Sequence, residues 1–190
     1  MNLIAAVLFQ VLGVRPAHQR QAVAARPQEA VDGGVGGVGG MKTVAILFAR
    51  ADSIYKTMPE CDVYDIDRDA RKFAGGIPVV AHPPCRAWGR LRHFATRTRP
   101  DEKGLALFAV DMVRSFGGVL EHPAGSTLWQ AASLPRPGCR DECDGWTLAV
   151  PQKLFGHKAE KASWFYIVGC APADIPDIPY VLGDATHVVQ

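Results

Sequence analysis

Short apolar runs of strand length recur along the chain, and most of them end at a charged residue or at a proline. The continuous run Val44–Phe48 is typical of a central parallel strand that is covered on both faces. The same reasoning predicts further strands over Asp62–Asp67, Val79–Ala81, Val119–Pro123 and Ser163–Gly169. Helical or loop segments separate these runs, so the pattern predicts one α/β domain with a mostly parallel sheet.

The clearest helix is predicted over Asp101–Phe116, with Asp101 as its N-cap and Gly117–Gly118 as its end. Its apolar residues recur at a spacing of three and four and are expected to face the core: Leu105, Phe108, Ala109, Met112, Val113 and Phe116. A strand lies on each side of this helix, which predicts a βαβ unit with parallel strands. Such a unit puts Cys85 and Glu121 at the same edge of the sheet.

Shorter elements complete the prediction. Short helical segments are expected at Ser53–Met58 and Ala124–Trp129, a loop over Leu134–Gly145, and irregular chain from Ala171 to Gln190. Residues 1–40 differ in kind, because they end in a glycine-rich linker and their apolar stretch, Asn2–Val14, is too short to span a membrane. We therefore expect residues 1–40 to be a disordered or non-native leader, residues 41–190 to be the compact domain, and no membrane association.

Composition narrows the class of protein. The chain has 190 residues, of which 48% are hydrophobic and 21% are charged, and its net charge of +2 does not by itself indicate nucleic-acid binding. The five cysteines are scattered, which indicates a reducing, cytoplasmic setting rather than a disulfide scaffold. Cys139 and Cys143 are half of a zinc site at most, so no metal is expected; in the alternative, His82 and Cys85 complete a zinc-stabilised structural domain.

Candidate chemistry lies where the predicted strands end. Cys85 follows Pro83 and Pro84 on a strand-end loop, at the edge where open α/β sheets bind ligands, so it is a candidate nucleophile; the alternative is a buried, unreactive cysteine. Asp65 and Asp67 end the second predicted strand, where a carboxylate can accept hydrogen bonds from a ribose diol. In the alternative, these acids cap the turn that follows.

A basic segment follows Cys85 and contains no acidic residue. Its members are Arg86, Arg90, Arg92, His93, Arg97 and Arg99, interleaved with Trp88 and Phe94. Such a segment can hold phosphates while an aromatic side chain stacks on a base. The alternative is an ordinary solvated surface.

These motifs, taken in order, resemble the DNA (cytosine-5) methyltransferases. The resemblance rests on a strand ending in Pro83-Pro84-Cys85, a later strand ending in Glu121-His122-Pro123, and a closing Gly156–Gly169 segment with basic residues ahead of an aromatic strand. It implies a Rossmann-like, methyltransferase-type sheet with helices on both faces. It also implies that Cys85 attacks carbon 6 of a flipped cytosine in DNA while Glu121 holds the edge of the base.

The resemblance further implies S-adenosylmethionine as cofactor, held by Phe48, Asp65, Asp67 and Pro83. The residues expected to contact DNA are Pro84, Arg86, Arg90, Arg92, His122, Pro123, Lys158 and Lys161. The chain departs from the family in having Arg50-Ala51-Asp52 in place of a glycine-rich turn and no room for a target-recognition region between Trp146 and Phe155. Either specificity is minimal, a protein partner supplies it, or the chemistry has changed. The alternative function is a catalytically degenerate nucleic-acid-binding module.

Overall fold

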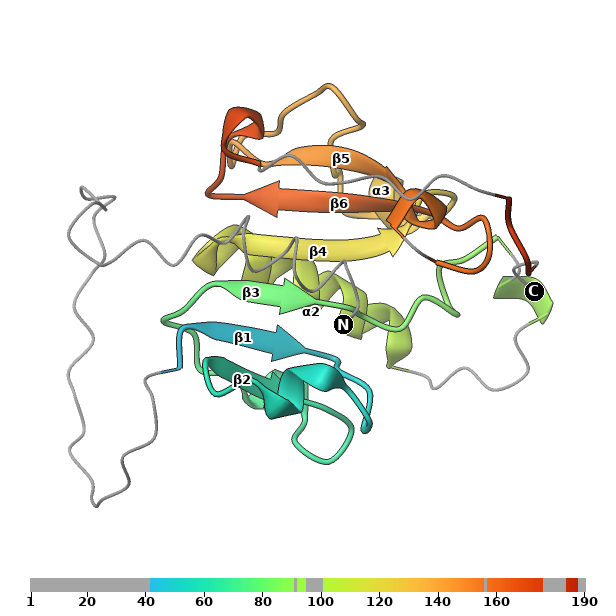
Figure 1. The fold of residues 1–190 in the computed structure, drawn as a ribbon. Helices are drawn as coiled ribbons and strands as arrows, with labels where there is room; N and C mark the ends of the chain where they lie inside the picture. The colour runs from blue at the N-terminus through green and yellow to red at the C-terminus, as the bar shows by residue number, and fades with distance from the viewer. Residues whose placement is uncertain (1–41, 91, 95–100, 156, 176–183, 188–190) are drawn as a thin grey trace, which may run out of the picture.

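The computed structural model describes residues 42–90, 92–94, 101–155, 157–175 and 184–187. The predicted leader, Arg97 and Arg99 lie outside the described residues. The described chain forms an α/β domain around one six-stranded sheet with the strand order β2-β1-β3-β4-β6-β5 (Figure 1). The strands are β1 (Val44–Leu47), β2 (Cys61–Tyr64), β3 (Val79–Ala81), β4 (Gly118–Pro123), β5 (Trp146–Pro151) and β6 (Ala162–Val168).

The sheet is mixed, as the arrows of Figure 1 show: β1 to β4 run parallel to one another, and β6 runs antiparallel to both β4 and β5. The mostly parallel arrangement was predicted, whereas strand β5 was not. The strand order reverses between β1 and β3, because β2 lies on one side of β1 while β3 and β4 lie on the other. In open α/β sheets, the crevice at the carboxyl ends of the strands beside such a reversal is where ligands bind.

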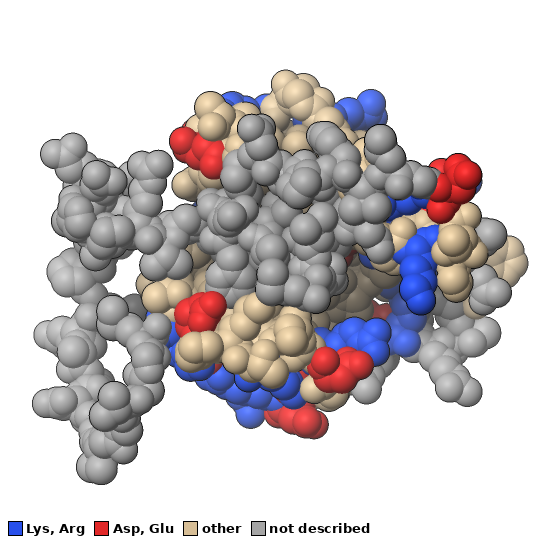
Figure 2. Space-filling model, in the orientation of Figure 1, with Lys and Arg blue, Asp and Glu red and all other residues tan. Residues whose placement is uncertain are grey.

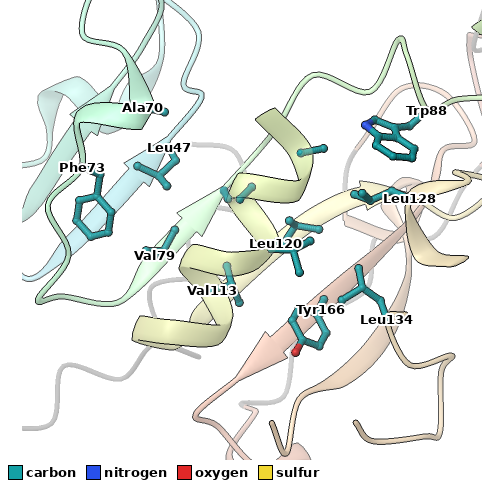
Figure 3. Packing of buried hydrophobic residues seen from close by; sticks show 14 of the residues in the cluster. Leu47, Ala70, Phe73, Val79, Trp88, Val113, Leu120, Leu128, Leu134 and Tyr166 are labelled. Carbon is teal, nitrogen blue, oxygen red and sulfur yellow. The ribbon is translucent and has the colours of Figure 1, made fainter. Parts of the chain in front are cut away.

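Both α-helices, α2 (Glu102–Phe116) and α3 (Leu128–Ala131), contribute to the hydrophobic cluster on one face of the sheet (Figure 3). The cluster on the opposite face contains Val44, Val80 and Phe165, and Tyr55 from a 3-10 helix joins it. Helices on both faces were expected, but within the described residues the α-helices occupy one face. The 3-10 helices are η2 (Ile54–Thr57), η3 (Ala70–Lys72), η4 (Arg92–Phe94), η5 (Gln152–Phe155) and η6 (Pro172–Asp174).

Helix α2 packs on the sheet through small side chains. Its buried apolar residues are Ala106, Ala109, Val110 and Val113, whereas the larger Phe108, Met112 and Phe116 are only partly buried. Asp101 is the N-cap residue, as predicted, but its side chain makes no cap hydrogen bond and instead pairs with Arg71 at 3.3 Å. The helix ends as predicted, because Gly117 has a φ of 74° and a Cβ at Gly118 would overlap the backbone of Val79.

Candidate functional site

The Pro-Pro-Cys segment leaves the carboxyl end of β3 as a short turn fixed to the domain. The Cys85 carbonyl accepts hydrogen bonds from the amides of Trp88 (3.0 Å) and Gly89 (2.8 Å). Trp88 is buried in the core cluster, and its carbonyl accepts from both the amide (3.0 Å) and the hydroxyl (3.1 Å) of Thr127. Cys85 itself is an exposed free thiol, so the alternative of a buried cysteine is wrong. Its side chain is accessible to a substrate.

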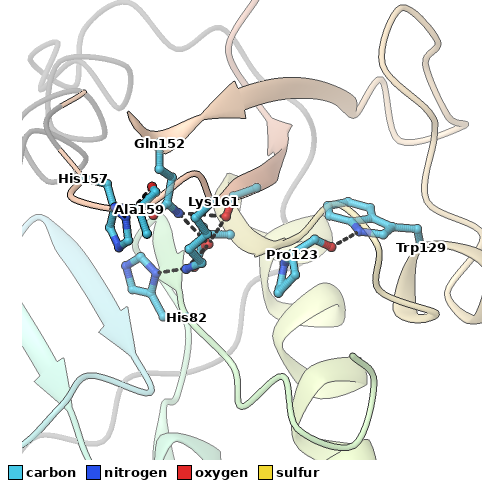
Figure 4. Close-up of polar contacts among 9 residues, drawn as sticks. His82, Pro123, Trp129, Gln152, His157, Ala159 and Lys161 are labelled. Atoms are coloured by element: carbon cyan, nitrogen blue, oxygen red, sulfur yellow. Dashed lines mark hydrogen bonds and ion pairs between the residues drawn. The ribbon is translucent and has the colours of Figure 1, made fainter. Parts of the chain in front are cut away.

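Glu121 lies near the end of β4, and four side chains surround its carboxylate (Figure 4). Oε1 accepts hydrogen bonds from Ser163 Oγ (2.6 Å) and Gln152 Nε2 (3.1 Å), and Lys161 Nζ lies 3.4 Å away. His82 Nδ1 lies 3.5 Å from Oε2. We call these five residues the Glu121 cluster. Its members come from β4, β6 and the segments that follow β3 and β5.

The cluster keeps the Glu121 carboxyl ionised. Burial by itself would raise the pKa of Glu121, but the hydrogen bond with His82, the charge of Lys161 and the hydroxyl of Ser163 outweigh it and hold the pKa well below its ordinary value. The strand register explains the contact with His82. Ala81 pairs with Leu120, so the next residues along the two parallel strands are His82 and Glu121.

A tyrosine extends the cluster away from Glu121. The hydroxyl of Tyr55, on η2, lies 3.5 Å from His82 Nε2, and the two rings stack with centroids 6.1 Å apart. With its proton on Nδ1, His82 donates to Glu121 and accepts from Tyr55, so the imidazole joins a hydroxyl to a carboxylate. Sequence reasoning identified Glu121 and Lys161 but missed Tyr55, Gln152, Ser163 and this role of His82. The position of His82 directly after a predicted strand was the available signal.

His122 does not line this cluster, contrary to the prediction that it contacts the substrate, whereas Pro123 is half-buried and part of it remains accessible. Side chains alternate along β4, and His122 falls on the face of α3, where it is fully buried edge-on against Trp129 at a centroid distance of 6.5 Å. Neither ring nitrogen of His122 has a hydrogen-bond partner within the described structure, and burial lowers its pKa to about 4. The Pro123 carbonyl accepts a hydrogen bond from Trp129 Nε1 (2.8 Å). Both residues therefore support α3.

The acids after β2 serve the local turn. Asp65 Oδ1 accepts hydrogen bonds from the amides of Asp67 and Arg68, both at 3.0 Å, and Oδ2 pairs with Lys56. The hydrogen bond from Lys56, followed by that from the Arg68 amide, lowers the pKa of Asp65 to about 2. Asp65 therefore caps the turn that follows β2, which was the alternative interpretation of this residue. The side chain of Asp67 is exposed.

These contacts bear on the expected S-adenosylmethionine site. The Asp65 carboxylate is buried and its oxygens are occupied, and Pro83 is buried. Phe48 has a φ of 62° and packs against the core cluster. In place of a glycine-rich turn, Arg50 and Asp52 form an exposed ion pair at 2.9 Å. Asp65 and the Arg50-Ala51-Asp52 turn therefore do not fit the cofactor-binding arrangement that the resemblance implies, whereas Asp67 stays exposed, and the proposed chemistry does not involve that cofactor.

The predicted phosphate-binding residues divide into two groups. Arg86 pairs with Glu102, a buried carboxylate in the first turn of α2, and Lys161 belongs to the Glu121 cluster. Arg90 and Lys158 are exposed, and Arg92 contacts only the Gly89 carbonyl at 3.4 Å in the described structure. Pro84 is half-buried. Among the predicted residues that the structure describes, Arg90, Arg92 and Lys158 are therefore the cations without a carboxylate partner.

Comparison with protein-family models, with curated proteins and with solved structures found no match. Among the described residues, no helix has the length and apolar character needed to cross a membrane. Within the same residues, no three His, Cys, Asp or Glu side chains lie close enough together to hold a metal ion, so the structure does not assemble the zinc alternative of His82, Cys85, Cys139 and Cys143. Any assignment of function rests on the geometry above.

Proposed function

We propose that the chain is an enzyme of the cytosine-5 methyltransferase type that modifies a pyrimidine base in DNA, with Cys85 as covalent nucleophile and Glu121 as the group that holds the base. One observation carries the proposal. An ionised carboxylate surrounded by donors lies near the end of β4, and an exposed cysteine follows the end of the adjacent parallel strand β3. The strand order reverses at β1 and β3, and the carboxyl ends of strands beside such a reversal are where open α/β sheets bind ligands, which supports the proposal.

The proposed chemistry begins with the addition of the Cys85 thiolate to carbon 6 of the pyrimidine, which moves an electron pair into the ring and makes carbon 5 nucleophilic. Glu121 Oε2, whose one contact in the described structure is His82 Nδ1 at 3.5 Å, accepts a hydrogen bond from the exocyclic amine of cytosine and fixes the orientation of the ring. Carbon 5 then takes an electrophile, which is a proton from water when no other is present. Loss of the original carbon 5 hydrogen as a proton and departure of the thiolate restore the aromatic ring.

This scheme is tested by exchange at carbon 5, which needs no methyl donor. The protein is incubated with DNA whose cytosines are tritiated at carbon 5, and tritium released into water is counted. We expect wild-type protein to release tritium and Cys85→Ser to release none. Cys143→Ser, which removes another exposed free thiol, is the matched control and should behave as wild type. Glu121→Gln should slow release by about 10²-fold.

Two outcomes contradict the proposal. Tritium release that persists in Cys85→Ser, or that disappears in Cys143→Ser, shows that Cys85 is not the nucleophile. A wild-type protein that binds DNA but releases no tritium, with or without added S-adenosylmethionine, supports the second candidate, a nucleic-acid-binding module without catalysis. The occupied carboxylate of Asp65 and the missing glycine-rich turn favour that candidate.

A further inference from the structure

We infer that Phe94 is a base-stacking residue, whose ring packs against a nucleobase of a bound nucleic acid beside the Cys85 turn. The inference rests on the proposed function in one respect, that the partner is a nucleic acid. The side chain of Phe94 is 80% exposed, which exceeds Ile66 (66%), Ile54 (43%) and Leu107 (37%), the other large hydrophobic side chains that are exposed in the described structure. An aromatic ring that is exposed to water on the protein surface can stack on a nucleobase.

The charges around Phe94 indicate a nucleic acid rather than an apolar protein surface. Arg92 and His93 share the 3-10 helix η4 with Phe94, and Arg90 precedes it. Within the described structure neither Arg90 nor Arg92 pairs with a carboxylate, whereas the charge of Arg86 is matched by Glu102. In Figure 2, Lys and Arg side chains lie on the side toward which the parallel strands point in Figure 1, and also along the lower edge and at the top of the molecule, with Asp and Glu side chains among them. Unmatched positive charge beside an exposed ring suits a phosphate and its base.

Two residues shortly before Phe94, Trp88 and Arg90, are packed against the domain. Trp88 is buried in the core, and Lys103 Nζ lies 5.6 Å from the centre of its ring. The side chain of Arg90 packs beside Gly125, where an added Cβ would lie 2.9 Å from the Cδ of the arginine. This packing lowers the entropy cost of binding at Arg90, because its side chain already lies against the domain.

The test measures binding of the full chain to a fluorescently labelled oligonucleotide, single-stranded or in a duplex, by anisotropy over a range of salt concentrations. Phe94→Ala should weaken binding by roughly tenfold to a hundredfold, the loss expected for one stacked base, with the salt dependence unchanged. Phe94→Trp should bind as tightly as wild type and add an emission that the nucleic acid quenches. Leu107→Ala, which removes another exposed hydrophobic side chain, should change nothing.

Arg90→Ala separates charge from stacking, because it should reduce the salt slope by about one phosphate contact. The inference is overturned if Phe94→Ala binds as wild type, if the added tryptophan emission is not quenched, or if wild-type protein binds neither oligonucleotide. Stronger binding to the single strand identifies an unpaired base as the stacking partner, and equal binding identifies a base extruded from the duplex. If Phe94→Ala weakens binding but wild-type protein releases no tritium, the proposed enzyme is contradicted and the role of Phe94 stands. If tritium is released but Phe94→Ala binds as wild type, the role of Phe94 is contradicted and the proposed enzyme stands.

Discussion

Glu121 and His122 are neighbours on β4, yet the two faces of the sheet give them opposite environments. On one face, the Glu121 carboxylate receives donors from Ser163, Gln152 and Lys161 and also contacts His82. On the other face, His122 is fully buried and neither of its ring nitrogens has a hydrogen-bond partner within the described residues. Both side chains are largely removed from water, so burial alone does not determine charge. Glu121 stays ionised because donors replace its hydration, and His122 stays neutral because nothing does.

The largest loss of stability is expected from a substitution on the face of the sheet that carries Glu121. Glu121→Ala leaves the buried donors of Ser163 and Gln152, and the part-exposed Lys161 and His82, without their acceptor. At roughly 1–3 kcal/mol for each buried donor, the expected loss is about 3–5 kcal/mol of unfolding free energy. The measurement is urea denaturation followed by circular dichroism. Asp67→Ala, which removes an exposed carboxylate, is the control and should stay within about 0.5 kcal/mol of wild type. Equal stability of the two variants contradicts the role of the cluster in folding.

On the opposite face of the sheet, the buried and neutral His122 should make stability depend on pH. The pKa of His122 falls from 6.5 to about 4 on folding, so between these values the unfolded chain binds a proton that the folded chain does not. Stability should therefore decrease as pH falls from 6.5 to 4, by on the order of 3 kcal/mol from this residue. Glu121 and Asp65, whose pKa values are lowered, add a further loss only below their ordinary values of 4.5 and 3.8.

Replacement of the imidazole isolates the contribution of His122. In His122→Gln, the slope of unfolding free energy against pH should flatten between pH 6.5 and 4, whatever the stability of the variant at neutral pH. The loss at lower pH should remain, because the Glu121 cluster and Asp65 are intact. An unchanged slope in this interval would mean that His122 takes up its proton in the folded state.

The smallest loss of stability is expected from removal of one uncharged hydrogen-bond donor, the hydroxyl of Ser163. Ser163→Ala removes the 2.6 Å hydrogen bond to Glu121 and the 2.7 Å hydrogen bond that Ser163 Oγ accepts from Gln152, but keeps Lys161 and His82 in place. Because Gln152 still donates to Glu121, the expected cost is about 2 kcal/mol, typical of a hydrogen bond to a charged group. Thermal unfolding at neutral pH measures it. Ser115→Ala, on the exposed side of α2, is the matched control and should be neutral or slightly stabilising. If Ser163→Ala costs as much unfolding free energy as Glu121→Ala, then the hydroxyl of Ser163, rather than the charged groups, accounts for the stability of the cluster.

Much of the framework was predictable from the amino-acid sequence. The apolar runs at β1 and β6, the prolines after β3 and the glycines after α2 act locally, and each set the end of its element within one or two residues. The parallel β3-α2-β4 unit followed from the same signals. The exposure of Cys85 agreed with its position after two prolines. Strand β5 was missed because it follows a loop rich in proline, glycine and charge.

The contacts of the candidate site were decided by the tertiary structure. His82 and Glu121 are 39 residues apart, and Ser163 is 42 residues from Glu121, so their meeting depends on the order of β3, β4 and β6 in the sheet. Local propensity does not encode that order. The same holds for Asp65, which the turn and Lys56 occupy, and for His122, which alternation turns away from the cluster. The sequence by itself determined which side chains reach the edge of the sheet, and the packing of distant segments determined which of them keep their charge and which remain available to a ligand.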